Sequence, residues 1–301
     1  MSTNQPARIF FLLAREVNKA VVFRRGPTKW TQMIVWDLNS DELEYGQWSK
    51  VKFQKWRCDL SPSGKHLIYL DDQFENGDSA TVVSKPPFWA AIAKWKHYNP
   101  LFGIGGGVFR SENEVTLNWH YMLEADELFP VPPQLKVICK GESFNVETTR
   151  LKRDGWSLLD AKQFINNRIK YLSKPSIFWD DIYKFWEDSV RGNKFQSTPK
   201  LWSKPVTKSS SLYRLSYYHY EKYKRLSKFF IKRRQEVNEL EQVEWAEVDC
   251  NGRIIASKNG TLIASKTFND GSVQLGNLEL LHDLNPQKPE EIPVPDIMKR
   301  W

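Results

Sequence analysis

The residues between 212 and 234 carry the clearest chemistry in the sequence, because cationic and aromatic side chains alternate there. Eight basic residues stand against one acidic residue, Glu221, so this segment holds +7 of the chain's net charge of +8. Phosphates attract the cations, and unpaired bases stack on aromatic rings. The candidate residues for binding a nucleic acid or another polyanion are Lys222, Tyr223, Lys224, Arg225, Lys228, Phe229, Lys232, Arg233 and Arg234. The alternative is a solvated hairpin face, and the conformation of 220–242 stays open between helix and strand.

A second group of aromatic and basic side chains surrounds the loop RRGPTKW at 24–30. Loops on rigid β scaffolds often carry binding sites. Trp30, Trp48 and Trp56 fit the core of a sheet equally well. A predicted helical segment adds two further tryptophans, and it either packs on a sheet edge or forms a docking face. The candidate residues for contacting a partner protein are Arg24, Arg25, Lys29, Trp30, Trp179 and Trp186.

The residue patterns typical of cofactor binding and of metal sites are missing from the sequence. The glycine run GIGGG at 103–107 lacks the third glycine of a dinucleotide-binding loop, because position 108 is Val108. Gly64-Lys65 is followed by His66, where a phosphate-binding loop requires Ser or Thr. The five histidines are scattered, which argues against a metal site. We therefore expect no catalytic residue, no cofactor and no metal.

Adjacent carboxylates keep one enzymatic alternative open. Pairs occur at 71–72, 180–181 and 290–291. Glycosidases need two carboxylates that face each other across a cleft, whereas adjacent residues of a strand point to opposite faces. A glycan-active or other hydrolytic propeller would instead bring two or more carboxylates together at one mouth of its channel.

The stretch RCDLSPSGKHLIYL at 57–70 indicates the scaffold, because a related pattern recurs in VEWAEVDCNGRIIAS at 243–257. In both stretches a strand ends, a short turn uses a glycine (Gly64 or Gly252) that tolerates positive φ, and a new strand begins. Asn259-Gly260 is a strong two-residue hairpin signal. The strands predicted in the first half are 20–23, 31–36, 48–56, 67–70, 82–83, 88–95, 108–110 and 115–119. Short strands at a spacing of about 8–12 residues are typical of a sandwich, barrel or propeller.

Several motifs resemble known propeller blades. SPSGK at 61–65 and VWD at 35–37 resemble the blades of WD-repeat and TolB-type propellers. Together with 24–30, 46–48, 86–95 and 105–109, the stretch 57–70 is similar to an uncharacterised family of bacterial proteins with no established activity. The resemblance extends over residues 8–120 and 212–285, and it implies architecture only. We expect a mainly β fold with a propeller-like arrangement of short antiparallel sheets, and a two-sheet β-sandwich is the alternative.

The predicted organisation is a single β-rich domain over 1–301. β portions cover 8–150 and 212–285, and a proline-rich strap follows at 286–301. Residues 156–192 break the strand pattern, since apolar residues recur there with helical periodicity behind the potential caps Asp160 and Ser176. A helical insert is therefore predicted between the two β portions.

The composition of the chain indicates its cellular compartment and its class of function. The three cysteines have no zinc or disulfide spacing, and no apolar run is long enough for a signal segment or a membrane span. We predict a soluble, cytoplasmic protein without a membrane partner. The predicted function is a non-catalytic β scaffold that binds a protein partner, with nucleic-acid binding as the second possibility. The sequence does not indicate an oligomeric state.

Overall fold

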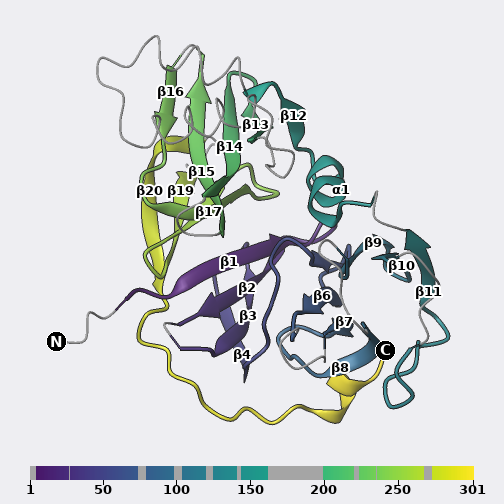
Figure 1. The fold of residues 1–301 in the computed structure, drawn as a ribbon. Helices are drawn as coiled ribbons and strands as arrows, with labels where there is room; N and C mark the ends of the chain where they lie inside the picture. Colours follow the sequence, from purple (N-terminus) through teal and green to yellow (C-terminus); the bar gives the residue numbers. More distant parts are fainter. Residues whose placement is uncertain are drawn as a thin grey trace.

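A computed structural model describes residues 5–26, 28–73, 79–97, 104–119, 125–140, 144–161, 199–219, 224–234, 236–267 and 273–301. The chain forms five small sheets that follow one another along the sequence, and helix α1 (Val146–Arg153) lies between the third and the fourth (Figure 1). Among the described strands, only β10 and β11 pair in parallel. The predicted propeller-like, mainly β fold is confirmed, and five sheets in place of two exclude the sandwich.

Sheets A and B each consist of four strands in sequence order, joined as antiparallel hairpins. Sheet A contains β1 (Arg8–Leu13), β2 (Lys19–Arg25), β3 (Thr31–Asp37) and β4 (Leu43–Ser49). Sheet B contains β5 (Asp59–Leu60), β6 (Leu67–Asp71), β7 (Ala80–Ser84) and β8 (Ala91–Lys96). The inner strands are buried along almost their whole length, whereas the outer strand β4 is partly exposed. Continuous apolar runs such as those of β2 and β3 fit strands with both faces covered.

Sheet C has three strands and precedes the helix. It contains β9 (Gly107–Ser111), β10 (Glu114–Asn118) and β11 (Lys136–Lys140), with β10 in the middle. The side chain of Asn145 caps α1 by accepting a hydrogen bond from the Thr148 amide at 2.8 Å. Glu147 lies in the first turn and three basic residues lie in the last, so both ends of the helix complement its dipole.

Sheets D and E form the second half of the molecule. Sheet D contains β12 (Ser157–Leu159), β13 (Lys200–Thr207), β14 (Ser210–His219), β15 (Lys224–Arg233) and β16 (Glu236–Glu239). Sheet E contains β17 (Val243–Val248), β18 (Ile254–Lys258), β19 (Thr261–Thr267) and β20 (Val273–Asp283). Each sheet keeps the order of the sequence.

The five sheets contact one another in a closed ring. β1 contacts β5, β5 contacts β9, and α1 bridges β9 and β12. β15 then contacts β17, and β17 returns to β1. The main hydrophobic core runs through sheets A, B, D and E. The ring therefore joins the first and last sheets of the chain.

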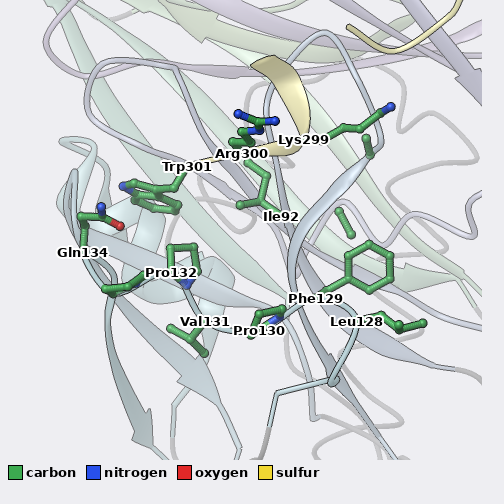
Figure 2. Close-up of a pocket in the computed structure, with 13 residues that line it drawn as sticks. Ile92, Leu128, Phe129, Pro130, Val131, Pro132, Gln134, Lys299, Arg300 and Trp301 are labelled. Carbon is green, nitrogen blue, oxygen red and sulfur yellow. The ribbon is translucent and has the colours of Figure 1, made fainter. Parts of the chain in front are cut away.

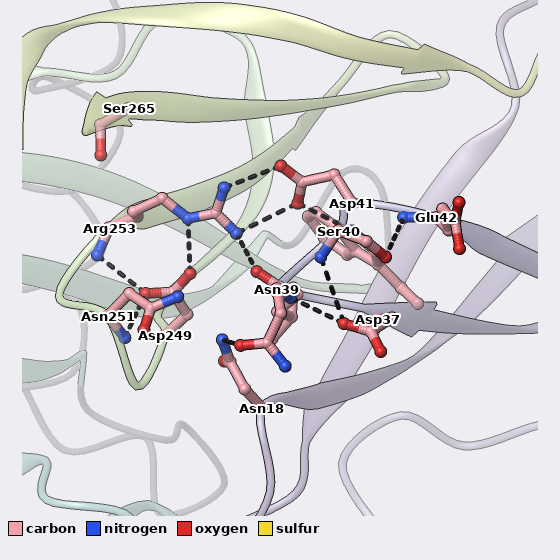
Figure 3. Close-up of polar contacts among 12 residues, drawn as sticks. Asn18, Asp37, Asn39, Ser40, Asp41, Glu42, Asp249, Asn251, Arg253 and Ser265 are labelled. Carbon is pink, nitrogen blue, oxygen red and sulfur yellow. Dashed lines mark hydrogen bonds and ion pairs between the residues drawn. The ribbon is translucent and has the colours of Figure 1, made fainter. Parts of the chain in front are cut away.

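Polar contacts reinforce the junction between sheets A and E (Figure 3). The guanidinium of Arg253 donates to the Asp41 carboxylate at 2.8 and 3.1 Å, to Asp249 at 2.7 Å and to the Leu38 carbonyl at 2.7 Å. On the other side of the junction, Ser257 donates its hydroxyl hydrogen to the Ile9 carbonyl at 3.0 Å. Except for the local Arg253–Asp249 contact, these bonds join residues more than two hundred positions apart, so they depend on the closed ring.

The predicted turns are confirmed by their backbone geometry. Gly64 and Gly252 have φ of 73° and 74°, in the left-handed region that favours glycine. Asn259 and Gly260 have φ of 49° and 78°, as the two-residue turn between β18 and β19 requires. The glycine run that was excluded as a phosphate loop feeds β9 directly.

Two element predictions were wrong and one lies largely outside the described residues. Residues 48–56 do not form one strand, because β4 ends at Ser49 and only Phe53 makes a further bridge, to Asp71. Helix α1 interrupts the predicted β portion 8–150, because the cap at Asn145 and the buried contacts of the helix outweigh the strand preference of this segment. Within the predicted helical insert, 157–159 is strand β12, while 162–198 falls outside the described residues.

The strap 286–301 leaves sheet E, passes sheet A and ends against sheet B (Figure 1). A short 3₁₀ helix (Asp296–Lys299) precedes Trp301, whose ring stacks on His66 with centroids 4.0 Å apart. Burial lowers the pKa of His66 to about 4, so a neutral imidazole stacks on the indole at neutral pH.

Candidate functional site

The basic segment forms the β14–β15 pair, and its cations divide between the two faces of sheet D. Side chains alternate along a strand, so Arg225 and Lys228 point in opposite directions. Arg225 donates to Glu147 of α1 at 2.6 Å, whereas Lys228 donates to Glu239 of β16 at 2.6 Å. The ring of Phe229 is fully buried, so it is not placed to stack on a base in this conformation.

The other predicted residues of this segment differ in exposure, and some of them fall outside the described residues. Lys232 and Arg233 are half-buried, and Arg234 is exposed with φ of 49°. Lys224 lies on β15 opposite His219. Lys222 and Tyr223 fall outside the described residues, as do Trp179 and Trp186. The predicted cations whose side chains the structure describes therefore do not make one continuous polyanion surface.

Glu147 is the centre of a buried charge network that the sequence analysis missed. It accepts hydrogen bonds from Arg214 and Arg225, and its side chain is 7% exposed against 1% for Arg214. Burial alone would raise the pKa of Glu147, but Arg214 and Arg225 hold it below its ordinary value. Because β14, β15 and α1 each supply a member, the network ties the helix to sheet D.

Two tryptophans enclose the cationic side of this network. The guanidinium of Arg214 lies 5.0 Å from the ring centroid of Trp56 and 4.6 Å from that of Trp245. The ammonium of Lys55 lies 4.4 Å from Trp56 and 5.7 Å from Trp245. Burial, followed by repulsion from Arg214, lowers the pKa of Lys55 to about 8.

Replacing Lys55 with methionine is expected to stabilise the protein by about 1–2 kcal/mol at about pH 7. A pKa lowered from 10.5 to about 8 corresponds to roughly 3 kcal/mol against the charged form. The lost cation–π contact offsets about 1–2 kcal/mol of that gain. Stability of the wild type should rise between pH 8 and 10.5, where the unfolded chain binds the proton and the folded chain does not. Urea unfolding across this pH range measures the slope, and a slope that persists in K55M would contradict the assignment.

The stretch 57–60 serves as the anchor of α1. Asp59, 1% exposed, accepts two hydrogen bonds from Arg153, at 2.6 and 2.8 Å, and one from the Phe109 amide at 2.7 Å. Arg150 donates to the Cys58 carbonyl. Burial raises the pKa of the Cys58 thiol to about 12, so Cys58 is an unreactive core residue.

The N-terminal aromatic–basic group is mostly structural. Arg24 is buried and donates to the carbonyls of Leu284 and Asn285 at 3.0 and 3.1 Å, so it closes the ring and does not face a partner. Arg25 and Trp30 are half-buried, and Lys29 is exposed. Of the four candidates in this loop, Lys29 is therefore the most exposed and Arg24 the most buried.

An apolar groove lies beside sheet B, and no role has been described for it so far. It is here called the proline groove (Figure 2). Its volume is about 770 Å³, and it lies between β8, the loop Leu128–Gln134 and the end of the strap. The loop runs along the outer edge of β8, where the Asp126 amide donates to the Lys94 carbonyl at 2.8 Å and the Lys94 amide to the Phe129 carbonyl at 3.2 Å. The lining residues are Ala90, Ala91, Ile92, Leu128, Phe129, Pro130, Val131, Pro132, Pro133, Gln134, Lys299, Arg300 and Trp301.

One side of the proline groove is apolar and the other is basic. Leu128 is 82% exposed and lies on the loop side of the groove (Figure 2). Lys299 and Arg300 lie together on the opposite side of the groove, as Figure 2 shows. The groove thus presents an apolar floor beside two cationic side chains, of which Lys299 already donates to the Asp296 carboxylate at 2.9 Å.

The described residues hold no group of three or more histidine, cysteine, aspartate or glutamate side chains placed to bind a metal ion. Asp71 and Asp72 support a neighbouring loop, since Asp71 accepts from the Lys52 amide at 3.0 Å and Asp72 from the Gln54 side chain at 2.8 Å. The pair 180–181 falls outside the described residues.

No helix in the described part of the chain is both long enough and apolar enough to cross a membrane.

The fold is similar to β-propeller domains of known structure. The β-propeller domain of the Trilobed protease from Pyrococcus furiosus, described as having an open velcro topology, matches with a TM-score of 0.30 at 10% identity. That match covers 93% of this chain and 84% of the other. TolB from Acinetobacter baumannii matches with a TM-score of 0.26 at 9% identity, over 89% of this chain and 53% of TolB. At this level the likeness concerns architecture alone.

No protein-family model and no curated protein matches the chain. The resemblance to a bacterial family therefore has no support beyond the propeller-like architecture.

Proposed function

We propose that this chain is a non-catalytic, propeller-like scaffold that binds a protein partner, and that the proline groove accepts an extended segment of that partner. The observation that carries the proposal is the 82% exposed Leu128 at the edge of an apolar groove of about 770 Å³. Large exposed apolar side chains beside a preformed groove are typical of interaction sites.

The charge around the groove indicates the chemistry of the partner segment. Lys299 and Arg300 line the groove, and Lys85 lies near it because its ammonium donates to the Ile297 carbonyl at 3.3 Å. Complementary charge steers association and fixes the register of a bound segment. An extended segment with apolar side chains and acidic flanks fits this surface.

A peptide selection tests the proposal directly. Random peptides displayed on phage are selected against the immobilised full chain and then measured by fluorescence anisotropy. Enriched sequences should combine apolar residues with Asp or Glu, and L128D should weaken their binding by about 10-fold or more, since a charge would then face the apolar segment. L280D is the matched control, because Leu280 is 63% exposed on β20, outside the groove. Peptides that bind L128D as well as the wild type would remove the groove from the proposal.

A pull-down from the native host with wild type, L128D and L280D extends the same comparison to whole proteins. A partner retained by L280D and lost by L128D supports the proposed scaffold function. Partners that are identical for all three baits would place the interaction elsewhere on the molecule.

A further inference from the structure

The side-chain amine of Lys55 has no role in the proposed function. Lys55 and Trp56 are the two central residues of a turn between sheets A and B. The Arg57 amide closes this turn by donating to the Gln54 carbonyl at 2.9 Å. The Cys58 thiol donates to the Lys55 carbonyl at 3.1 Å, so the backbone that carries the amine is fixed. None of these residues lines the proline groove, and the two sites are therefore independent.

Aromatic rings and further cations surround the amine. Its Nζ lies 4.4 Å from the ring centroid of Trp56 and 5.7 Å from that of Trp245, and the Arg214 guanidinium lies over the same two rings. Five other charged groups surround it from β1, α1, β14, β15 and β17, and these are Arg8, Glu147, Arg214, Arg225 and Glu244. Cations outnumber carboxylates among them, so the surroundings oppose a further positive charge.

A small molecule can reach this amine. Lys55 is half-buried, and its Nζ forms no hydrogen bond or ion pair with a described residue. The buried nitrogen atoms that lack both a partner and contact with solvent include Nη2 of Arg150 and the indole nitrogen of Trp245, but not Nζ of Lys55. An amine that has no partner and is not closed off in this way keeps some surface open to solvent.

The same surroundings make the amine a nucleophile. Burial, followed by repulsion from Arg214, lowers the pKa of Lys55 to about 8. At pH 7 about one tenth of the molecules then carry a neutral amine, roughly 300-fold more than for an ordinary lysine. A lysine that is desolvated and next to another cation is activated to attack carbonyl carbons.

We propose that Lys55 is a covalent binding site for a small aldehyde or ketone, with which its amine forms a Schiff base. The lone pair of the nitrogen forms a bond to the carbonyl carbon, and the carbonyl oxygen leaves as water with the two protons of the amine. A C=N bond replaces the C=O bond, so the step needs no oxidant, reductant or further reactant. The indole rings of Trp56 and Trp245 stand beside the new bond and favour an apolar carbon skeleton.

Reductive trapping of the full chain with propanal and sodium cyanoborohydride at about pH 7 tests the proposal. Cyanoborohydride reduces the Schiff base to a stable propylamine, which peptide mass mapping assigns to individual lysines. We expect Lys55 to be labelled at least about 10-fold faster than the exposed Lys29 and Lys65, because more of its amine is neutral. The K55M chain should lose this fast phase and keep the slow labelling of the other lysines.

Unfolding the chain in guanidinium chloride separates the effect of the fold from that of the local sequence. Lys55 should then react at the same rate as Lys29 and Lys65, since the indoles and Arg214 no longer surround it. Equal labelling of the three lysines in the folded chain, or an advantage of Lys55 that persists after unfolding, would overturn the proposal. Neither result bears on the proline groove, because peptide binding is measured separately.

Discussion

Replacing Glu147 with glutamine is expected to lower the free energy of unfolding by about 3–5 kcal/mol, the usual cost of removing one partner from a buried ion pair. Glutamine keeps the shape of the side chain but not its charge. Arg214, 1% exposed, would then be a buried cation with Arg225 and Lys55 nearby and no carboxylate between them. Urea unfolding followed by tryptophan fluorescence measures the change.

One control variant outside this network and one double variant within it test the prediction. E239Q removes a carboxylate from a partly exposed pair with Lys228, so it should cost less than about 1 kcal/mol. The double variant E147Q/R214M should be more stable than E147Q, because it no longer buries an unpaired charge. If E147Q costs no more than E239Q, the network does not stabilise the ring.

Replacing Asp59 with asparagine is expected to lower the free energy of unfolding by about 3 kcal/mol. The carboxylate accepts three hydrogen bonds, and asparagine would place an amide donor against at least one of the donors it faces. Arg153 would keep only Asp154 as an acidic partner. Since Asp59 joins β5, β9 and α1, amide hydrogen exchange in α1 should accelerate more than in sheet A.

The matched control for D59N is E114Q. Glu114 pairs with Lys136 at 3.0 Å on the surface of sheet C, where Lys136 is 68% exposed. Its replacement should change stability by less than about 1 kcal/mol. Equal unfolding midpoints for D59N and the wild type would show that α1 is held by its apolar contacts alone.

The strand and turn pattern was predictable because its signals are local. Gly64, Gly252 and the Asn259-Gly260 pair occupy backbone positions with positive φ, and few other residues adopt them without strain. Apolar runs between such turns predict short hairpins, and hairpins in sequence order build sheets A, B and E. These features depend on neighbours in the sequence, so they could be inferred without the structure.

Helix α1 and the charge network depend on residues that are distant in the sequence. They could therefore not be predicted from local sequence patterns. Val146, Thr148 and Thr149 are β-branched and favour a strand over a helix. The helix forms because its cap and its buried contacts outweigh that preference, and Glu147 meets Arg214 only when sheet D has folded. Asn145 followed by Glu147 was the one local signal of a helix start.

The pairing of the basic segment 212–234 also depends on residues that are distant in the sequence. Counting charges between 212 and 234 gave +7, but a strand sends alternate side chains to opposite faces. The acidic partners Glu147 and Glu239 come from outside the segment, so no local count could show that they pair with Arg214, Arg225 and Lys228.

The closure of the ring sets an order of events during folding. Sheets A, B and E are built from antiparallel hairpins, which form rapidly, whereas β1 is covered only when β17 arrives from residues 243–248. Contacts of such long sequence separation slow folding far more than they lower stability. During synthesis from the N-terminus, the apolar strand Arg8–Leu13 therefore has one flank open until nearly the whole chain has been made. We therefore expect this strand to be prone to aggregation in the nascent chain until β17 covers it.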